Sequence, residues 1–321
     1  MKIFPFSDPI LLPLSPTITS AIADYLQSIA QKPNINSLQK NWARDVIELQ
    51  PDLYERGQFH RSIRQISTSQ YQYVSTIAHQ LAAKSVLTPL EICQNLDIPI
   101  RTLTVVEQSV HLELNCWYNE ASYIYFQLAP RSIEIWLNYI HDLPFEQLGF
   151  TGASTEAGSI DVAIYAHARC CSRLKLAAAE KLVKVTADWL LDRGSSKDRL
   201  TTESNCIFDN PAEQQLIQTL MAVLDVIYGD YRQLDSSQSQ LIEQIRVEAL
   251  NGHRKSPKLA KLTIDLAKSW LEFDRHCQIF GQIKYQNPQL AVARCGLTAI
   301  SRRYLQVLLE NYLSVKAPVE L

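Results

Sequence analysis

The sequence predicts a mainly α-helical protein in which a small α+β domain, residues 1–146, precedes a larger helical bundle, residues 161–321. Three observations support this prediction. The chain has 321 residues, of which 46% are hydrophobic, and this is enough for two domains. Only 9 residues are glycine, and residues that favour helices dominate the second half. Branched and aromatic residues, which favour strands, concentrate after Leu103 instead.

The amino-terminal region begins with helical patterns. Apolar side chains recur on one side of residues 15–29, and Ser15 or Thr17 can cap that helix. The same period predicts a second helix over 70–83 and a short third helix over 88–95.

The pattern changes to strands after Leu103. "LTVVEQSVHLELN" and "ASYIYFQLA" are rich in branched and aromatic residues, which predicts two or three antiparallel strands with a turn near Asn119 and Glu120. The stretch "SIEIWLNYI", residues 132–140, fits either a strand or a short helix. The amino-terminal domain is therefore of the α+β class.

A glycine-spaced stretch, "QLGFTGASTEAGS", follows this domain. It lacks the GKS or GKT ending of a phosphate-binding loop, and no clear strand leads into it. We therefore expect residues 147–160 to form a linker.

The carboxy-terminal half reads as a series of helices without a repeat of fixed period, which favours a compact bundle over a solenoid. Pro211, Pro257 and Pro288 suit first-turn positions, because a helix start does not use the missing N–H donor. The predicted helices cover residues 161–192, 211–230, 236–250, 257–280 and 288–313.

Charge is balanced overall and polarised locally. The formal net charge is −2, so no global field favours nucleic acid or membrane. Residues 251–303 nevertheless carry ten Lys or Arg against three acids, whereas residues 201–250 carry two against eight. The basic segment could neutralise phosphates, or it could form a solvated helix face that pairs with the acidic helices.

Cysteine usage and apolar patterning point to a soluble cytoplasmic protein. The 7 cysteines form no CxxC pair, and an odd number does not suggest a disulfide framework. Asp8 and several prolines interrupt the apolar residues at the amino terminus, and no segment reaches the roughly 20 apolar residues of a spanning helix.

The stretch "IYAHARCCSRL", residues 164–174, combines a histidine and two cysteines, residue types that bind metals or act in catalysis. On a helix Cys170 and Cys171 point about 100° apart, so they cannot readily chelate one metal, and His167 lacks further partners for a zinc site. No GxSxG motif and no short Cys–His motif occurs. We expect neither metal, cofactor nor catalysis here. Instead, Tyr165, Arg169 and Arg173 share one helical arc, suited to holding phosphates and stacking a base.

Three blocks of the sequence resemble the DALR anticodon-binding domain of arginyl-tRNA synthetases. "AIYAHARCCSRLKLA" is similar to its opening helix, "KLAKLTIDLAKSWLEFDRHCQIF" to its penultimate long helix, and "AVARCGLTAISRRYLQVLLENYLSVKAPVEL" to its last helix and tail. "YVSTIAHQLA" and "VHLELN" resemble, more weakly, the additional domain that precedes the catalytic core in that family. The resemblance implies an anticodon-binding-like bundle.

The chain also departs from that family. It has neither a His-x-Gly-His nor a KMSKS signature, so the resemblance implies no arginine-tRNA ligase activity. Family members commonly have a tyrosine where this chain has Asp274, and a carboxylate there removes a stacking platform and repels phosphate.

These observations lead to the hypothesis of noncatalytic binding of tRNA or another structured RNA. The RNA-binding candidates are two aromatic residues that would stack and five arginines that would contact phosphates: Tyr165, Trp270, Arg169, Arg173, Arg294, Arg302 and Arg303. Capping and pairing between helices is the alternative role for the arginines, and a core position is the alternative for Trp270. Two other functions remain open: a protein-interaction scaffold or assembly factor, and an accessory subunit that delivers tRNA to a modifying enzyme.

Overall fold

The computed structural model of the chain describes residues 63–65, 71–83, 87–95, 101–107, 110–142, 160–192, 208–228 and 257–320, and every structural statement below concerns these residues. Most of them are helical, as the sequence predicts. The chain divides into two compact units, which are described separately. The first comprises Met1–Ile135 and Leu224–Asp235, and the second comprises Trp136–Val223 and Ser236–Leu321.

The first unit contains an antiparallel five-stranded sheet with the strand order β1-β2-β5-β4-β3. The strands are β1 (Ile63–Gln65), β2 (Gln72–Ser75), β3 (Arg101–Glu107), β4 (Val110–Tyr118) and β5 (Ile124–Leu128). In β2, β5 and the 112–116 part of β4, buried and more exposed side chains alternate, because successive residues of a strand point to opposite sides. The predicted strands and the turn after Tyr118 are confirmed.

The predicted helix over 70–83 is wrong in its first half. Gln72–Ser75 is strand β2, paired with β5, and only Ile77–Ala82 is helical (α4). Tyr73 and Ser75 are fully buried while Gln72 and Val74 are partly exposed, so burial here follows the period of 2 of a strand. Apolar residues in so short a segment fit both periods, and pairing with β5 decides between them.

Two helices complete the described part of this region. The predicted short helix is confirmed as α5 (Pro89–Asn95), and the Thr88 and Glu91 side chains cap each other's backbone N–H groups at its start. Residues 132–140, whose sequence fits either a strand or a short helix, are helical and form part of α6 (Pro130–Asp142). Ile133, Trp136 and Ile140 are buried at helical spacing, and the boundary between the two units falls after Ile135.

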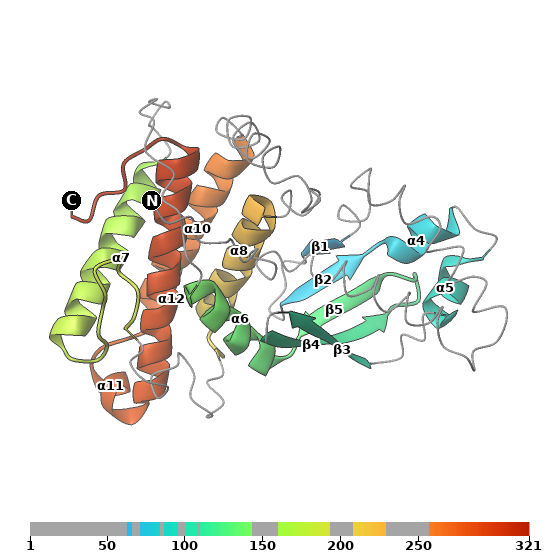
Figure 1. The fold of residues 1–321 in the computed structure, drawn as a ribbon, viewed down its shortest axis with the longest axis horizontal. Coiled ribbons are helices and arrows are strands. Elements are labelled where there is room, and N and C mark those ends of the chain that lie inside the picture. The colour runs from blue at the N-terminus through green and yellow to red at the C-terminus, as the bar shows by residue number, and fades with distance from the viewer. Residues whose placement is uncertain are drawn as a thin grey trace, which may run out of the picture. The chain divides into compact units, whose positions relative to one another are not determined.

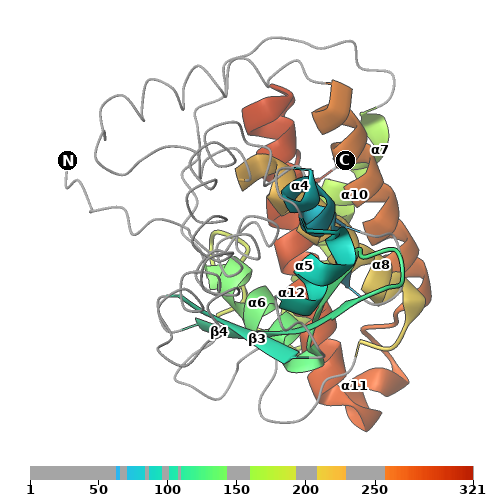
Figure 2. The same ribbon diagram turned by 90° about the vertical axis from the view of Figure 1, so that its right-hand side faces the viewer.

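The second unit contains helices α7 (Asp161–Ala179), α10 (Pro257–His276), α11 (Gln282–Gln286) and α12 (Pro288–Val307). It also contains α8 (Pro211–Tyr228) as far as Val223, and α6 from Trp136 onward. A π-helical turn, Leu308–Tyr312, continues α12. Helices α7, α10 and α12 contact one another in pairs, and Figure 1 shows them running side by side. Figure 2 gives the perpendicular view, in which α11 lies at one end of α12.

The three prolines mark helix starts, as predicted. Helices α8, α10 and α12 begin at Pro211, Pro257 and Pro288. Asn287 caps α12 by accepting a hydrogen bond from the Leu290 N–H at 3.1 Å.

The helix predicted over 161–192 is shorter than expected, because α7 ends at Ala179. Lys181 adopts a positive φ of 55°, which is incompatible with a right-handed α-helix. Val185 then pairs with Leu191 in an isolated antiparallel bridge. The expected helices over 15–29 and 236–250, and residues 147–159 of the expected linker, lie outside the described residues. Among the described helices, none combines the length and apolar character required to cross a membrane.

Candidate functional site

Helix α7 has the two faces that the sequence predicts. Ala166, Cys170 and Leu174 are buried at helical spacing, on the side that packs against the neighbouring helices. Tyr165 is 43% exposed and Arg169 lies one turn further along. The helix thus presents an aromatic and basic surface beside its apolar side, because consecutive residues of a helix point about 100° apart.

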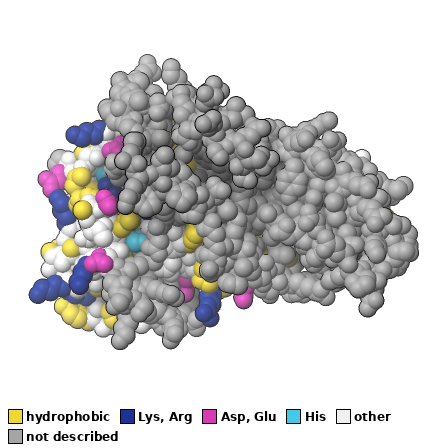
Figure 3. All heavy atoms as spheres, in the orientation of Figure 1, with side chains coloured by type: hydrophobic (Ala, Val, Ile, Leu, Met, Phe, Trp, Pro, Cys, Tyr) yellow, Lys and Arg dark blue, Asp and Glu magenta, His cyan; other side chains and the backbone are white. Residues whose placement is uncertain are grey.

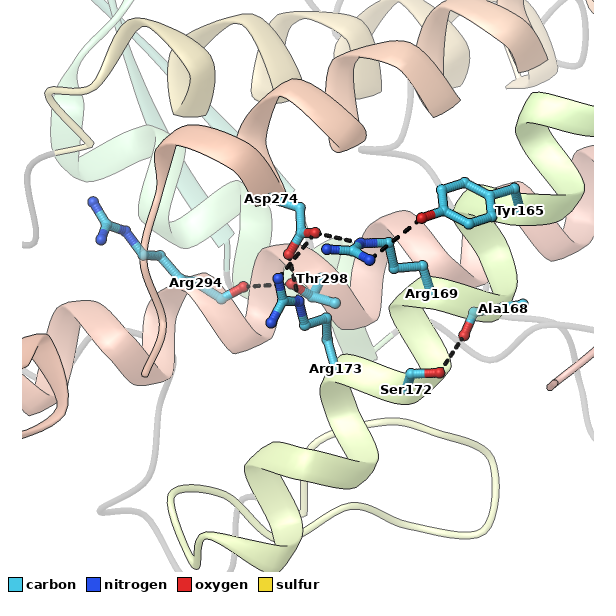
Figure 4. A network of polar contacts seen from close by, with 8 residues as sticks. All are labelled: Tyr165, Ala168, Arg169, Ser172, Arg173, Asp274, Arg294 and Thr298. Carbon is cyan, nitrogen blue, oxygen red and sulfur yellow. Dashed lines mark hydrogen bonds and ion pairs between the residues drawn. The ribbon is translucent and has the colours of Figure 1, made fainter. Parts of the chain in front are cut away.

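Arg169 and Arg173 converge on one carboxylate, that of Asp274 in the last turn of α10 (Figure 4). Arg169 Nε donates to Oδ2 at 2.6 Å, Arg173 Nε donates to Oδ1 at 2.5 Å, and Arg173 Nη2 donates to Oδ2 at 3.1 Å. Arg169 Nη1 also donates to the Tyr165 hydroxyl at 3.3 Å. We call these four residues, Tyr165, Arg169, Arg173 and Asp274, the Asp274 cluster.

The Asp274 cluster combines a shielded anion with accessible cations. The side chain of Asp274 is 6% exposed, whereas those of Arg169 and Arg173 are 40% and 29% exposed. The hydrogen bond to Asp274 is the main cause that raises the pKa of Arg169. Arg173 also lies over the ring of Phe280, with 5.8 Å from the guanidinium carbon to the ring centre. The two cations outnumber the one anion, so the cluster keeps a net positive charge.

Arg294 belongs to a different environment. Its Nε donates to Glu213 Oε1 at 2.6 Å and its Nη1 donates to the Gln278 carbonyl at 2.6 Å, and the Arg294 and Glu213 side chains are 10% and 1% exposed. In Figure 4 its guanidinium points away from Asp274. Arg294 therefore takes the alternative role, pairing between helices α12 and α8.

Arg302 and Arg303 are also buried, at 5% and 8% exposure. Arg302 lies over the Trp189 ring at 5.5 Å, and Arg303 Nη1 donates to the His141 carbonyl at 2.9 Å. Both guanidiniums thus contact protein groups inside the second unit. They are not displayed toward solvent as Arg169 is.

Trp270 is fully buried on α10, with 0% exposure, so its ring offers no face to a base in this structure. A core position was the alternative prediction for Trp270, and this alternative is confirmed. Of the seven RNA-binding candidates, only Tyr165, Arg169 and Arg173 come together on an accessible surface.

The surface of the second unit is mixed in charge. On the face drawn in Figure 3, lysine and arginine side chains are interspersed with acidic ones. On α10, exposed Lys268 and Arg275 alternate with exposed Asp265 and Glu272, and Arg275 donates to Glu272 at 2.9 Å. The basic excess of residues 251–303 is therefore smaller at the surface than in the sequence, because Arg294, Arg302 and Arg303 are buried and Arg275 is paired with Glu272.

His167 is a buried polar residue of α7 that contacts the carboxy-terminal segment. Its Nδ1 donates to the Pro318 carbonyl at 2.8 Å, and burial lowers its pKa to about 4. Within the described residues, Nε2 has no hydrogen-bond partner, which fits a neutral imidazole. Lys175 on the same helix pairs with Glu320. The carboxy-terminal segment is therefore held against α7 at two positions.

The cysteines of the described segments are buried free thiols, and they include Cys170 and Cys171. Burial raises the pKa of both thiols, so neither is poised as a thiolate. Across the described ranges, no three or more His, Cys, Asp or Glu side chains gather in a way that could hold a metal ion.

The sequence did not indicate that Glu213 pairs with Arg294. It also did not indicate that Asp274 pairs with arginines. The pairs Arg169–Asp274 and Arg294–Glu213 are separated by 105 and 81 residues along the chain. No local spacing rule links positions so far apart. The surplus of Lys and Arg over acids in residues 251–303 does not indicate which carboxylates pair with the arginines.

Comparisons with known proteins add no further constraint on the site. No family model, curated protein or solved structure matches the chain.

Proposed function

We propose that the protein binds tRNA or another structured RNA without catalysing a reaction, through the exposed face of α7. One observation carries this proposal: Tyr165, Arg169 and Arg173 form one connected and accessible aromatic and basic surface. Guanidiniums bind phosphate oxygens with paired N–H donors, and an exposed tyrosine can stack on a base.

The resemblance of three sequence blocks to the DALR anticodon-binding domain supports the same proposal. It suggests that helices α7, α10 and α12 form an anticodon-binding-like bundle, with α7 as its opening helix. The absence of both synthetase signatures from the sequence supports binding without catalysis. The contact surface that we propose is narrower than the sequence suggests, because Trp270, Arg294, Arg302 and Arg303 are buried.

Direct RNA binding tests this function. We expect the full chain to bind labelled bulk tRNA at low salt, measured by fluorescence anisotropy across a salt series. The Tyr165→Ala variant should bind roughly tenfold more weakly, because it loses a stacking platform. The Arg169→Gln/Arg173→Gln variant should reduce the slope of log affinity against log salt by roughly 1.5, since it loses two phosphate contacts.

Two exposed controls match these variants. Tyr285→Ala removes a tyrosine that is 77% exposed and lies on α11. Lys268→Gln/Arg275→Gln removes two exposed positive charges from α10. Each control should leave most of the affinity in place. Undetectable tRNA binding by the parent at low salt, or equal losses in the test and control variants, would contradict the proposal.

A second candidate function is a protein-interaction scaffold or assembly factor, and a specific observation favours it. Arg294, Arg302 and Arg303 all contact groups of the protein itself, so these three of the ten Lys and Arg in residues 251–303 lie in the interior. An accessory subunit that delivers tRNA to a modifying enzyme would combine both functions. Affinity purification with identification of bound RNA and protein separates the three: RNA alone, protein alone, or both in one complex.

A further inference from the structure

Arg169 and Arg173 together form an anion-binding site, which the Asp274 carboxylate already occupies. They lie four residues apart on α7, so their positive charges are neighbours on one helix face. Two like charges at this spacing repel each other unless an anion lies between them. Asp274 supplies that anion, and it accepts three hydrogen bonds from the two guanidiniums.

The same site suits a phosphate. Guanidinium groups bind carboxylates and phosphates with the same paired N–H geometry. The hydrogen bonds to Asp274 and Tyr165 use Nε and Nη1 of Arg169 and Nε and Nη2 of Arg173. Each guanidinium carries further N–H donors, and both side chains are partly exposed, so an oxyanion can approach from solvent.

The dipole of its own helix does not stabilise the negative charge of Asp274. It lies in the last turn of α10, where the helix dipole disfavours a negative charge, and the neighbouring Arg275 and His276 are the residue types preferred there. The favourable interactions of its carboxylate come instead from α7. A carboxylate in this position competes with any ligand for the two arginines.

We propose that Asp274 is a built-in competitor of RNA phosphate: its carboxylate binds N–H donors of Arg169 and Arg173 and offsets part of their positive charge, which would otherwise be available to a backbone phosphate. This inference rests on the proposed RNA-binding function and adds a residue that limits affinity. The ligand class is a phosphodiester oxyanion. The opposing interpretation is that Asp274 only ties α10 to α7.

The test compares two substitutions that each remove one negative charge from α10. Asp274→Asn keeps the side-chain shape and removes the competing charge. Glu272→Gln is the matched control, because Glu272 is two residues away, 51% exposed and paired with Arg275. Bulk tRNA affinity is measured for both by fluorescence anisotropy across a salt series. We expect roughly tenfold tighter binding for Asp274→Asn and at most about twofold for Glu272→Gln.

A further pair of variants links the gain to the arginines. Arg173→Gln combined with Asp274→Asn should lose the added affinity. Asp274→Ser provides a second way to remove the carboxylate, and it should also bind tRNA more tightly. Thermal unfolding of each variant checks that the fold is intact.

The possible outcomes distinguish a failure of this inference from a failure of the proposed RNA-binding function. If the parent binds tRNA and Tyr165→Ala weakens binding, but Asp274→Asn and Asp274→Ser bind no more tightly than Glu272→Gln, the competitor role is overturned and RNA binding stands. If neither the parent nor Asp274→Asn binds tRNA, both proposals are overturned. Tighter binding by Asp274→Asn that Arg173→Gln reverses supports the inference.

Discussion

Two arginine–carboxylate contacts of the second unit, one at Glu213 and one at Asp274, differ mainly in their exposure to water. Arg294 and Glu213 are almost completely enclosed, with 10% and 1% of their side chains exposed. Arg169 and Arg173 surround the shielded Asp274 but remain 40% and 29% exposed themselves. Nearly identical donor distances, 2.6 Å for both Arg294–Glu213 and Arg169–Asp274, therefore occur in two very different dielectric surroundings.

The difference determines what each arginine can do. A buried guanidinium cannot exchange its carboxylate for a ligand without opening the helices around it, and breaking such a pair leaves an uncompensated charge. A partly exposed guanidinium can turn toward water or a ligand at small cost. The distance between the charged atoms is thus a poor guide to function, and the exposure of the side chains is a better one.

The largest effect is expected at the buried pair. Arg294→Met should lower the free energy of unfolding by roughly 3 to 5 kcal/mol, because Glu213 would remain buried without its cation. Urea denaturation followed by circular dichroism measures this loss. Arg294→Met combined with Glu213→Gln should recover part of it, since no lone charge remains. A loss below about 1 kcal/mol for Arg294→Met would mean that the buried pair stabilises the protein no more than the Asp274 cluster does.

An intermediate effect is expected at His167, a buried neighbour of Arg169 on α7. Its pKa is lowered to about 4 in the folded state, against about 6.5 when unfolded. The neutral form is therefore favoured on folding, and its contribution is complete above about pH 6.5 and decreases as the pH falls toward 4. Between about pH 7 and pH 5 the parent should lose about 2 kcal/mol through this residue.

The His167→Asn variant checks this pH dependence. Asparagine can still donate a hydrogen bond toward the Pro318 carbonyl but does not titrate. Urea denaturation at several pH values should give a flatter curve for the variant than for the parent. Parallel curves for the two proteins would mean that His167 does not contribute.

The smallest effect on stability is expected at the Asp274 cluster. Asp274→Asn should change the free energy of unfolding by about 1 kcal/mol, because the asparagine oxygen still accepts a hydrogen bond and both arginines can hydrate. Glu272→Gln, at an exposed pair, provides the baseline. A loss for Asp274→Asn as large as that for Arg294→Met would show that the cluster is structural in the same sense as the buried pair.

Much of the helical framework could be predicted from local sequence. The starts of α8, α10 and α12 follow from proline, whose fixed φ and missing N–H suit a first turn. The two faces of α7 follow from the 3.6-residue period. Strand β2 was missed, because a four-residue strand is specified by its pairing with β5 and hardly at all by its own periodicity.

The candidate site could be predicted only in part, for a similar reason. Tyr165, Arg169 and Arg173 lie within one helix, where spacing alone places them together. Their counter-ion Asp274 lies on another helix, and only the packing of α10 against α7 brings it near. Sequence identified Arg294, Arg302 and Arg303 as basic residues but could not tell their burial, which depends on the helices that surround α12.

The contact between His167 and Pro318 spans 151 residues, and it has a consequence for synthesis of the chain. Helix α7 leaves the ribosome long before the segment that covers it has been made. At typical translation speeds that interval is on the order of ten seconds, during which His167 cannot donate to the Pro318 carbonyl. The contact between His167 and Pro318 must therefore wait until residue 318 has been made, whereas the contacts of α7 with α10 can form earlier.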